Sequence, residues 1–203
     1  MFRKDGIMRA DTICAGLTIT HRADCPSYFK PHLAKRLVST YLNRFDEVFC
    51  PFNGFSGIML GAAVGCGKTF VGQDLNATEI SESKNIVDFI KCSFNAEVDV
   101  TLKVKDLFDD SGKHECLIAC PPYGNEKTGN IEKWNFDENG NSIDKNLACD
   151  AWIDECLDRY DCKKYVFIVD DRTTVKHKAG IVETLTNRCH FGSNYEYVVV
   201  IER

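Results

Sequence analysis

The sequence has no long hydrophobic run and no recognisable export signal. No stretch of its 203 residues approaches the roughly 18 apolar residues that a membrane helix needs. The N-terminal residues contain no apolar segment followed by a small-residue cleavage site, which is the pattern of a secretory signal. We therefore expect a cytoplasmic protein with no membrane partner. The length suits a single globular domain, 1–203, with a substantial core.

The sequence also lacks paired metal-ligand motifs and an excess of positive charge. Its 11 cysteines and 5 histidines show no Cys-x-x-Cys or His-x-x-x-His spacing, so we expect no metal site. An odd number of cysteines cannot all pair, and we interpret them as reduced thiols that pack as small apolar residues. The net charge of −5 argues against broad, nonspecific nucleic-acid binding. A local basic face could still form from Lys30, Lys35, Arg36 and Arg44.

Short apolar runs alternate with segments of helical pattern along the chain. The expected strands are 47–52, 68–75, 99–104, 115–120, 163–171 and 196–203, and the expected helices are 28–43, 55–64, 81–92, 149–160 and 176–187. This alternation predicts an α/β fold, with a mostly parallel central sheet and helices on both faces. The direction of the final strand stays open. Residues 1–19 form an expected N-terminal extension, and 124–146 an expected long loop that could contact substrate.

The stretch GAAVGCGKTF (61–70) fits a relaxed phosphate-binding P-loop, with Lys68 and Thr69 at the gripping positions. A P-loop needs a strand before the glycines and a helix that starts at the lysine. Here the pattern favours the reverse order, with a helix before Gly65 and a strand after Lys68. A P-loop ATPase therefore stays as an alternative, supported by the acidic strand end VFIVDD (166–171).

A second glycine-containing segment, CPFNGFSG (50–57), follows an expected strand and opens an expected helix. Glycines in such a loop let a ligand approach the backbone while the helix amides face it. About twenty residues further on, the next strand ends at Asp74, at the position where an acid can accept hydrogen bonds from both hydroxyls of a ribose. Together these features predict a site for a nucleoside-bearing cofactor.

The fourth expected strand ends in Cys120-Pro121-Pro122-Tyr123. Prolines cannot donate to a strand ladder, so the strand must stop here. Its carboxyl end lies at the edge where α/β sheets bind ligands. Tyr123 offers a flat face on which a planar group can stack.

In this order, the motifs resemble those of the amino-methylating DNA methyltransferases that use S-adenosylmethionine, the N6-adenine and N4-cytosine type. Their catalytic motif is Asp, Asn or Ser followed by Pro-Pro and an aromatic residue. The resemblance runs from about residue 20 to the C-terminus and implies a Rossmann-like methyltransferase fold. It implies catalytic roles for Cys120, Pro121, Pro122 and Tyr123. It implies that the cofactor contacts Lys30, Pro31, Cys50, Pro51, Phe52, Asn53, Gly54, Ser56, Gly57, Asp74, Leu75, Asp106 and Leu107.

The implied reaction is a direct displacement, in which an exocyclic amine of adenine or cytosine attacks the methyl group of the sulfonium. The Pro121 carbonyl and the side chain at position 120 would accept hydrogen bonds from the amine. Two cysteines depart from the family pattern: Cys120 replaces Asp, Asn or Ser, and Cys50 replaces an Asp before the glycine loop. Because a neutral thiol is a weak acceptor, we expect Cys120 to be less effective than Asp or Asn.

No segment resembles a target-recognition domain, so a separate recognition chain or domain is an expected partner. We expect the nucleic acid to be DNA in preference to RNA, in the setting of restriction and modification. The alternatives are an RNA or protein-glutamine methyltransferase, a catalytically weak or silent cofactor-binding subunit, and the ATPase. The choice between adenine and cytosine, the target sequence and the oligomeric state stay open.

Overall fold

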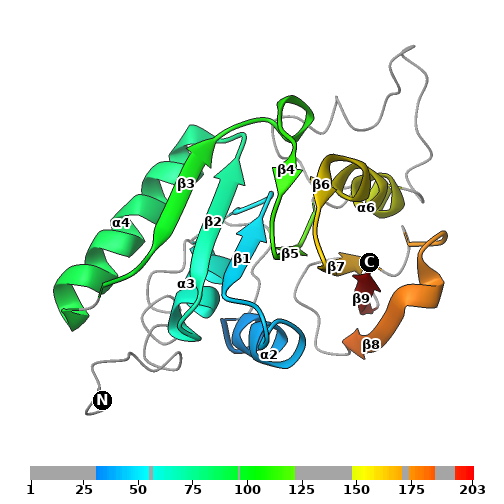
Figure 1. Cartoon of the computed structure of the whole chain (residues 1–203), viewed down its shortest axis with the longest axis horizontal. Coiled ribbons are helices and arrows are strands. Elements are labelled where there is room, and N and C mark those ends of the chain that lie inside the picture. The colour runs from blue at the N-terminus through cyan, green and yellow to red at the C-terminus, as the bar shows by residue number, and fades with distance from the viewer. Residues whose placement is uncertain (1–30, 55–56, 96, 122–147, 171–173, 186–194) are drawn as a thin grey trace.

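The computed structural model describes residues 31–54, 57–95, 97–121, 148–170, 174–185 and 195–203. They form a seven-stranded sheet of order β3-β2-β1-β5-β7-β9-β8 and a separate ladder of β4 and β6 (Figure 1). The strands are β1 (Glu47–Cys50), β2 (Thr69–Asp74), β3 (Val100–Val104), β4 (Gly112–Lys113), β5 (Cys116–Ala119), β6 (Tyr160–Asp161), β7 (Lys164–Asp170), β8 (Ile181–Leu185) and β9 (Glu196–Glu202).

The sheet is mostly parallel, as the alternation of strands and helices predicted. Strands β3, β2, β1, β5 and β7 run in one direction. The final strand, β9, is antiparallel to both of its neighbours, β7 and β8. The carboxyl ends of β1, β2, β3 and β5 consequently lie along one edge of the sheet.

The longer helices of the described part are α2 (Pro31–Tyr41), α3 (Ile58–Gly65), α4 (Ala77–Phe94) and α6 (Ala148–Arg159), and two single 3₁₀ turns are η2 (Leu107–Asp109) and η4 (Lys178–Gly180). Helix α4 begins where the side chain of Asn76 accepts a hydrogen bond from Thr78 N at 2.9 Å, a standard N-cap. It ends at Asn95, which adopts the left-handed conformation (φ 47°). The cap explains why α4 starts four residues earlier than the apolar pattern predicted.

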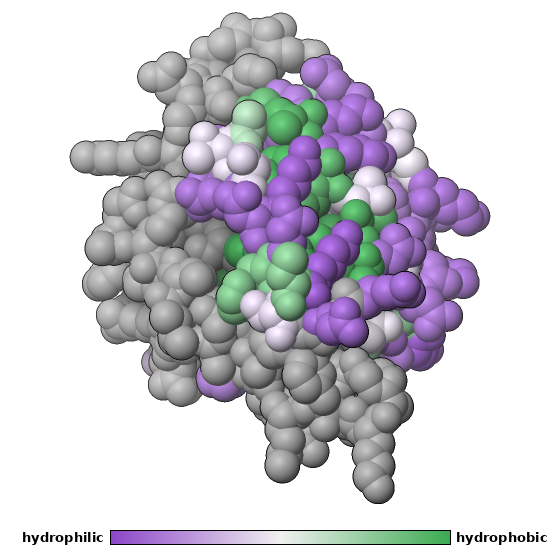
Figure 2. All heavy atoms as spheres, turned by 90° about the vertical axis from the view of Figure 1, so that its left-hand side faces the viewer, coloured by the Kyte–Doolittle hydropathy of each residue, from purple (hydrophilic) through white to green (hydrophobic). Residues whose placement is uncertain are grey.

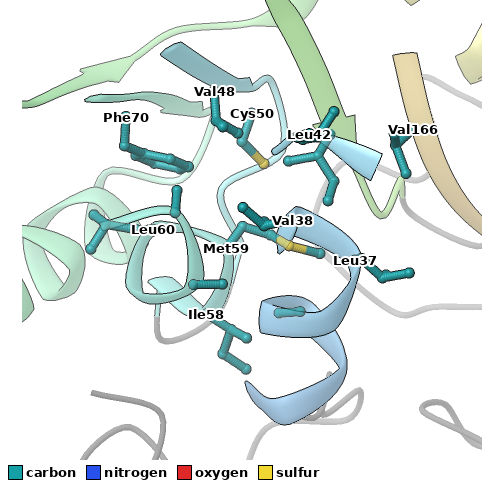
Figure 3. Close-up of a cluster of buried hydrophobic side chains, with 14 of the residues drawn as sticks. Leu37, Val38, Leu42, Val48, Cys50, Ile58, Met59, Leu60, Phe70 and Val166 are labelled. Carbon is teal, nitrogen blue, oxygen red and sulfur yellow. The ribbon is translucent and has the colours of Figure 1, made fainter. Parts of the chain in front are cut away.

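Side chains alternate between the two faces of the sheet, and each face has its own core. Val48 and Cys50 of β1 face a cluster with α2, α3 and α4, whereas Phe49 faces a second cluster with α6. Figure 3 shows the first cluster, in which side chains of α2 and α3 meet those of β1 and β2. Burial on both faces explains why these strands read as continuous apolar runs rather than alternating ones. The prediction of helices on both faces is confirmed.

The expected helix over 176–187 is wrong. The chain instead forms the η4 turn and then β8, which pairs with β9. Ile181, Val182 and Thr184 are β-branched residues that suit a pleated strand. Within β8 the burial alternates, with Glu183 and Leu185 less exposed than Val182 and Thr184. The spacing of apolar residues in this short segment also fits a helix, and the strand that pairs with it, β9, lies further along the chain, where a local pattern does not reveal it.

The segment that resembles a P-loop connects a helix to a strand. Helix α3 ends at Gly65, Gly67 takes the left-handed conformation (φ 72°), and Lys68 leads directly into β2. The Lys68 ammonium group donates hydrogen bonds to the carbonyl of Asn43 at 2.8 Å and to that of Phe45. The lysine therefore caps backbone carbonyls after α2. The strand–loop–helix order that phosphate binding requires does not occur here.

A candidate cofactor and substrate site at the carboxyl edge of the sheet

The candidate site lies where the strand order reverses. From the central β1, the chain proceeds to β2 and β3 on one side and later to β5 and β7 on the other (Figure 1). In open α/β sheets the loops that leave the carboxyl ends diverge at such a point and form a ligand-binding crevice. The segments that follow β1, β2 and β5 begin here, and they carry most of the residues that the sequence predicted for cofactor and substrate.

Asp74, at the end of β2, joins this strand to the loop after β1. Its Oδ2 accepts a hydrogen bond from Gly54 N at 2.8 Å, and its Oδ1 accepts one from Asn76 N at 2.9 Å. Burial raises the pKa of the Asp74 carboxyl, while the backbone N–H groups of Asn76 and Gly54 act in the opposite direction. A carboxylate has about four lone-pair positions. The backbone N–H of Leu75 also interacts with this carboxylate, so at least one position remains for a hydroxyl donor of a ligand.

The backbone of the loop after β1 requires glycine at two positions. Gly54 and Gly57 have φ angles of 59° and 52°, in the left-handed region that favours glycine. Among the described residues beyond its chain neighbours, a Cβ on Gly54 would meet only the carbonyl of Phe52, at 3.7 Å. Gly57 precedes α3 as its N-cap and packs against Ser83 of α4. Gly54 is thus a partly exposed position where a ligand could approach the backbone, and Gly57 serves close packing.

Asn53 anchors the loop to the neighbouring elements. Its side chain is 4% exposed, and Nδ2 donates to Ser83 Oγ in α4 at 2.6 Å. Its backbone N–H donates to the carbonyl of Gln73 in β2 at 2.8 Å. Its Oδ1 has no hydrogen-bond partner in the described part of the chain and lies 3.0 Å from where a Cβ of Gly72 would be. Asn53 therefore holds the loop after β1 against α4 and β2.

Cys50, where the family pattern has Asp, lies in the core. Its side chain is fully buried and its sulfur points among the side chains of α2 and α3 (Figure 3). The thiol donates to the carbonyl of Phe52 at 3.3 Å, and burial raises its pKa to about 12. Cys50 is thus a neutral packing residue. Pro51 is buried, and the half-buried Phe52 makes an edge contact with Trp152 of α6, with ring centroids 4.8 Å apart.

The remaining cofactor candidates lie on the next two strand ends. Leu75 follows Asp74 directly and is 40% exposed, which leaves an apolar surface beside the carboxylate. Asp106 caps η2, because its Oδ1 accepts from Phe108 N at 3.1 Å, and Leu107 is buried under this turn. These residues follow β2 and β3, which are adjacent and paired along the whole of β3.

A polar network that the sequence analysis missed holds the turn after β3. Gln73 Nε2 donates to Tyr160 Oη at 2.8 Å, and Tyr160 Oη donates to Asp110 Oδ2 at 3.3 Å. Lys105 forms an ion pair with Asp110 at 2.5 Å. The network connects the end of β2 to the residues that flank Asp106 and Leu107. A glutamine inside the apolar run TFVGQD was the available signal, since a buried amide requires partners.

Of the four residues of the candidate catalytic motif, the structure describes only Cys120 and Pro121. Cys120 and Pro121 follow β5; Cys120 is half-buried and packs against both cores, and Pro121 is buried. Pro31 is described as the first residue of α2. Lys30, Ser56, Pro122 and Tyr123 lie outside the described residues, as do the extension 1–19 and the loop 124–146.

The arginines of the expected basic face are paired with acids. Arg36 donates to both carboxylate oxygens of Glu183, at 2.9 and 2.6 Å, and Arg44 pairs with Glu202 at 3.1 Å. The contact with Arg36 lowers the pKa of the Glu183 carboxyl. Lys35 is half-buried. Arg36 and Arg44 thus connect α2 and the chain that follows it to β8 and β9, where acids offset their charges.

The described cysteines are free thiols, and most are packing residues. Cys50, Cys116, Cys149, Cys156 and Cys162 are buried. Within the described ranges, no group of three or more His, Cys, Asp or Glu side chains is arranged to hold a metal ion. None of the helices in these ranges is both long and apolar enough to cross a membrane.

Solved structures share the fold at low sequence identity. A putative RNA methyltransferase from Pyrococcus horikoshii, PH1948, aligns with a TM-score of 0.60 and 10% identity over 96% of this chain and 98% of that one. The putative methylase HI0767 from Haemophilus influenzae aligns with a TM-score of 0.52 and 14% identity over 82% and 86% of the two chains. The 16S rRNA N2 G1207 methyltransferase RsmC of T. thermophilus, in complex with AdoMet and guanosine, aligns with a TM-score of 0.54 and 12% identity over 90% of this chain and 44% of that one.

No family model and no curated protein matches the sequence. At identities this low, the structural likeness shows the fold alone. The chain has the Rossmann-like α/β fold that these methyltransferases share.

Proposed function

We propose that the protein binds S-adenosylmethionine at the carboxyl edge of the sheet and transfers its methyl group to an exocyclic amino nitrogen of a nucleic-acid base. The observation that carries this proposal is the contact between Gly54 N and Asp74 Oδ2. It joins the loop that carries Gly54 to an acid that keeps acceptor capacity for a ligand. Cys120 and Pro121 follow β5, the neighbour of β1 across the strand-order reversal.

The described residues fit the nucleoside half of this cofactor. Asp74 would accept hydrogen bonds from the ribose hydroxyls, and the exposed face of Leu75 would contact the adenine ring. Among the described residues beyond its chain neighbours, only the carbonyl of Phe52 lies near the Cβ position of Gly54, at 3.7 Å, which favours close approach of a ligand to this backbone. The cofactor supplies an electrophilic methyl group on a sulfonium. That methyl group and the attacking amine would meet beside the segment that begins with Cys120.

The residues after β5 would bind the amine and orient it. The Pro121 carbonyl would serve as the acceptor for one amine proton, which would help to localise the nitrogen lone pair for attack. Stacking of the base on Tyr123 would contribute about 1–3 kcal/mol. If the substrate is a duplex, the base must first leave the stack at a cost of a few kcal/mol.

The finer substrate assignment rests on the motif and on the neighbours. The order of the motifs supports adenine or cytosine in DNA. RNA is the second candidate, because PH1948 is described as a putative RNA methyltransferase and RsmC acts on N2 of a guanosine in rRNA. Guanine N2, adenine N6 and cytosine N4 are all exocyclic amines, so the same acceptors would serve each of them.

Calorimetric titration with S-adenosylmethionine, with ATP and magnesium in parallel, tests the cofactor half of the proposal on the wild type and Asp74→Ala. We expect the sulfonium cofactor to bind Asp74→Ala about tenfold to a hundredfold more weakly than the wild type, and ATP to bind neither protein. Transfer of a radiolabelled methyl group to single-stranded DNA, duplex DNA and RNA then identifies the substrate. Binding of the cofactor without transfer to any nucleic acid would reject the methyltransferase proposal in favour of a silent cofactor-binding subunit.

Two substitutions test the catalytic motif. Cys120→Ala should retain measurable activity, since a thiol is a weak acceptor. Tyr123→Ala should lose most of the activity, because it removes the stacking surface. The reverse ranking would reject the assignment of these two residues.

A further inference from the structure

Strand β3 is an edge strand whose outward backbone groups belong to three apolar residues. Phe70 N donates to the carbonyl of Asp99 at 3.0 Å, and Lys105 N donates to the carbonyl of Asp74 at 2.9 Å. In a parallel ladder, alternate residues direct both backbone groups to the same neighbour. Residues 99, 101, 103 and 105 therefore face β2. The N–H and C=O groups of Val100, Leu102 and Val104 face away from the sheet.

The surface around this edge is partly apolar. Val104 and Phe89 of α4 are each 54% exposed. Val100 and Leu102 are half-buried, and they pack against the core cluster that includes Val87 and Ile90 of α4. Figure 2, which views the molecule from the side of α4 and β3, shows hydrophobic surface between hydrophilic side chains. A sheet edge whose backbone groups point outward and whose neighbours are apolar is a template for pairing with another strand.

We propose that this edge pairs with the same edge of a second copy of the chain. The two β3 strands would run antiparallel about a two-fold axis at Leu102, and the sheet would continue across the dimer. Val100 would then lie opposite the partner's Val104, and Leu102 opposite the partner's Leu102. In this register every outward backbone group of Val100, Leu102 and Val104 has a partner, because opposite residues exchange both hydrogen bonds.

Charge is compatible with the pairing of two copies in this register and disfavours one neighbouring register. Asp99 lies opposite the partner's Lys105, and Thr101 lies opposite the partner's Lys103, so no like charges meet. A shift that moved the two-fold axis to Lys103 would place this lysine opposite the partner's Lys103. Opposite-charge pairs across antiparallel strands stabilise the pairing, and like charges destabilise it.

The geometry also brings the two α4 helices together. A two-fold axis normal to the sheet keeps both copies of α4 on the same face, beside the joined strands. Val104, whose side chain points to that face, and Phe89 would then lie near the contact between the two helices. This arrangement extends the interface beyond the strands, as a stable contact of about 1,000 Å² or more requires.

Proline at position 104 tests the pairing of the backbones. Proline is tolerated on an edge strand when the missing N–H faces outward, and the Val104 N–H makes no bond to β2 in this ladder. We expect sedimentation velocity to show a wild-type dimer, a dimer for the control Val104→Thr, and at least about tenfold weaker association for Val104→Pro. A monomeric wild type at about 100 µM, well above ordinary interface affinities, would overturn the proposal. A Val104→Pro protein that still dimerises with wild-type affinity would also overturn it.

Two opposite charges at one exposed position test the register. Thr101→Lys would place a lysine opposite the partner's Lys103 twice per dimer, and we expect about tenfold weaker association. Thr101→Glu would create two opposite-charge pairs and should associate at least as tightly as the wild type. Circular dichroism checks that both variants fold. Equal effects of the two charges would refute this register. A folded wild-type monomer that Val104→Pro destabilises far more than Val104→Thr would show that another segment of the same chain covers the edge.

Discussion

The backbone N–H of Gly54 lies 2.8 Å from Oδ2 of Asp74 and donates a hydrogen bond to it. This contact fixes the loop after β1 against the end of β2, although the two residues are far apart in the sequence. The carboxylate thereby has a structural role, in addition to its proposed role in binding ribose. Substitutions of Asp74 should therefore affect both stability and binding.

Asp74→Ala should weaken S-adenosylmethionine binding by roughly tenfold to a hundredfold, because hydrogen bonds to a charged group contribute about 1.5–3 kcal/mol. It should also lower the free energy of unfolding by about 1–3 kcal/mol, since the N–H groups of Gly54 and Asn76 lose their acceptor. Calorimetry and chemical denaturation measure the two effects. Asp158→Ala, on the exposed side of α6, is the control. Unchanged affinity in Asp74→Ala would remove Asp74 from the site.

The affinity for S-adenosylmethionine should decrease in acid. Burial raises the pKa of the Asp74 carboxyl, and only the carboxylate accepts at both oxygens. Above the pKa the affinity should be constant, and below it should decrease by about tenfold per pH unit. This decrease should begin at a higher pH than for an ordinary aspartate with a pKa near 4.

The raised pKa of the Asp74 carboxyl has opposite effects on cofactor affinity and on folding stability when the pH decreases. The native carboxyl binds its proton more tightly than the unfolded chain does, so acidification through this range stabilises the native state at this residue. Calorimetric titration with S-adenosylmethionine from pH 3 to pH 8, a range that begins below the ordinary aspartate pKa of about 3.9, measures the decrease of affinity in acid. In Asp74→Asn, the residual affinity for S-adenosylmethionine should not show this decrease in acid. If the affinity of Asp74→Asn for S-adenosylmethionine decreased in acid as much as that of the wild type, a group other than Asp74 would cause the decrease.

Tyr160→Phe should weaken binding of adenosine and of S-adenosylmethionine to similar extents. The change removes the hydroxyl group that connects Gln73 to Asp110, and the turn that carries Leu107 loses this support. The unfolding free energy should decrease by about 1–3 kcal/mol, because the Gln73 amide is left buried without its partner.

Tyr165→Phe is the matched control for this network. Its hydroxyl donates to the Tyr160 carbonyl at 2.5 Å and accepts from Cys162 N at 3.0 Å, so its loss also costs stability. Neither of these two bonds reaches the turn after β3. The affinities of Tyr165→Phe for adenosine and S-adenosylmethionine should therefore match those of the wild type. Equal losses of affinity in both variants would indicate a general effect of stability.

Cys50→Asp should destabilise the protein by several kcal/mol, although the family pattern has Asp at this position. The side chain is fully buried, and an unpaired charge in such a core is costly. Cys50→Ala should cost only about 1–2 kcal/mol through the smaller side chain and keep cofactor affinity. Thermal unfolding with parallel titration distinguishes the two variants. A stable Cys50→Asp protein with tighter cofactor binding would place this side chain in the site.

Lys68→Ala should lower the free energy of unfolding, and it should leave ATP hydrolysis as it is in the wild type. The lysine caps the carbonyls of Asn43 and Phe45, and removal of one such side chain costs about 1 kcal/mol. Chemical denaturation measures this loss, and Lys84→Ala on the exposed face of α4 is the control. An ATPase activity that disappears in Lys68→Ala would restore the P-loop interpretation.

The local patterns were sufficient for most of the sheet. Strands β1, β2, β5 and β7 are buried on both faces, so their apolar runs are visible without knowledge of their neighbours. The carboxyl-end positions of Asp74 and Cys120 follow from the strand boundaries. The reversed order around Lys68 was also predicted, because glycines that end a helix and β-branched residues that begin a strand are local signals.

The sequence by itself determined the α/β class, the order of the main helices and strands from α2 to β7, and the strand ends at which Asp74 and Cys120 lie. Only the tertiary structure decided which of the candidate side chains face the carboxyl edge of the sheet. Cys50 and Asn53 turn inward because α2, α3 and α4 pack over them, and Gln73 and Tyr160 meet because β2 and the end of α6 converge. It also made 181–185 a strand, through pairing with β9. Such contacts join residues distant in the chain, and a local period carries no information about a partner that folding brings alongside.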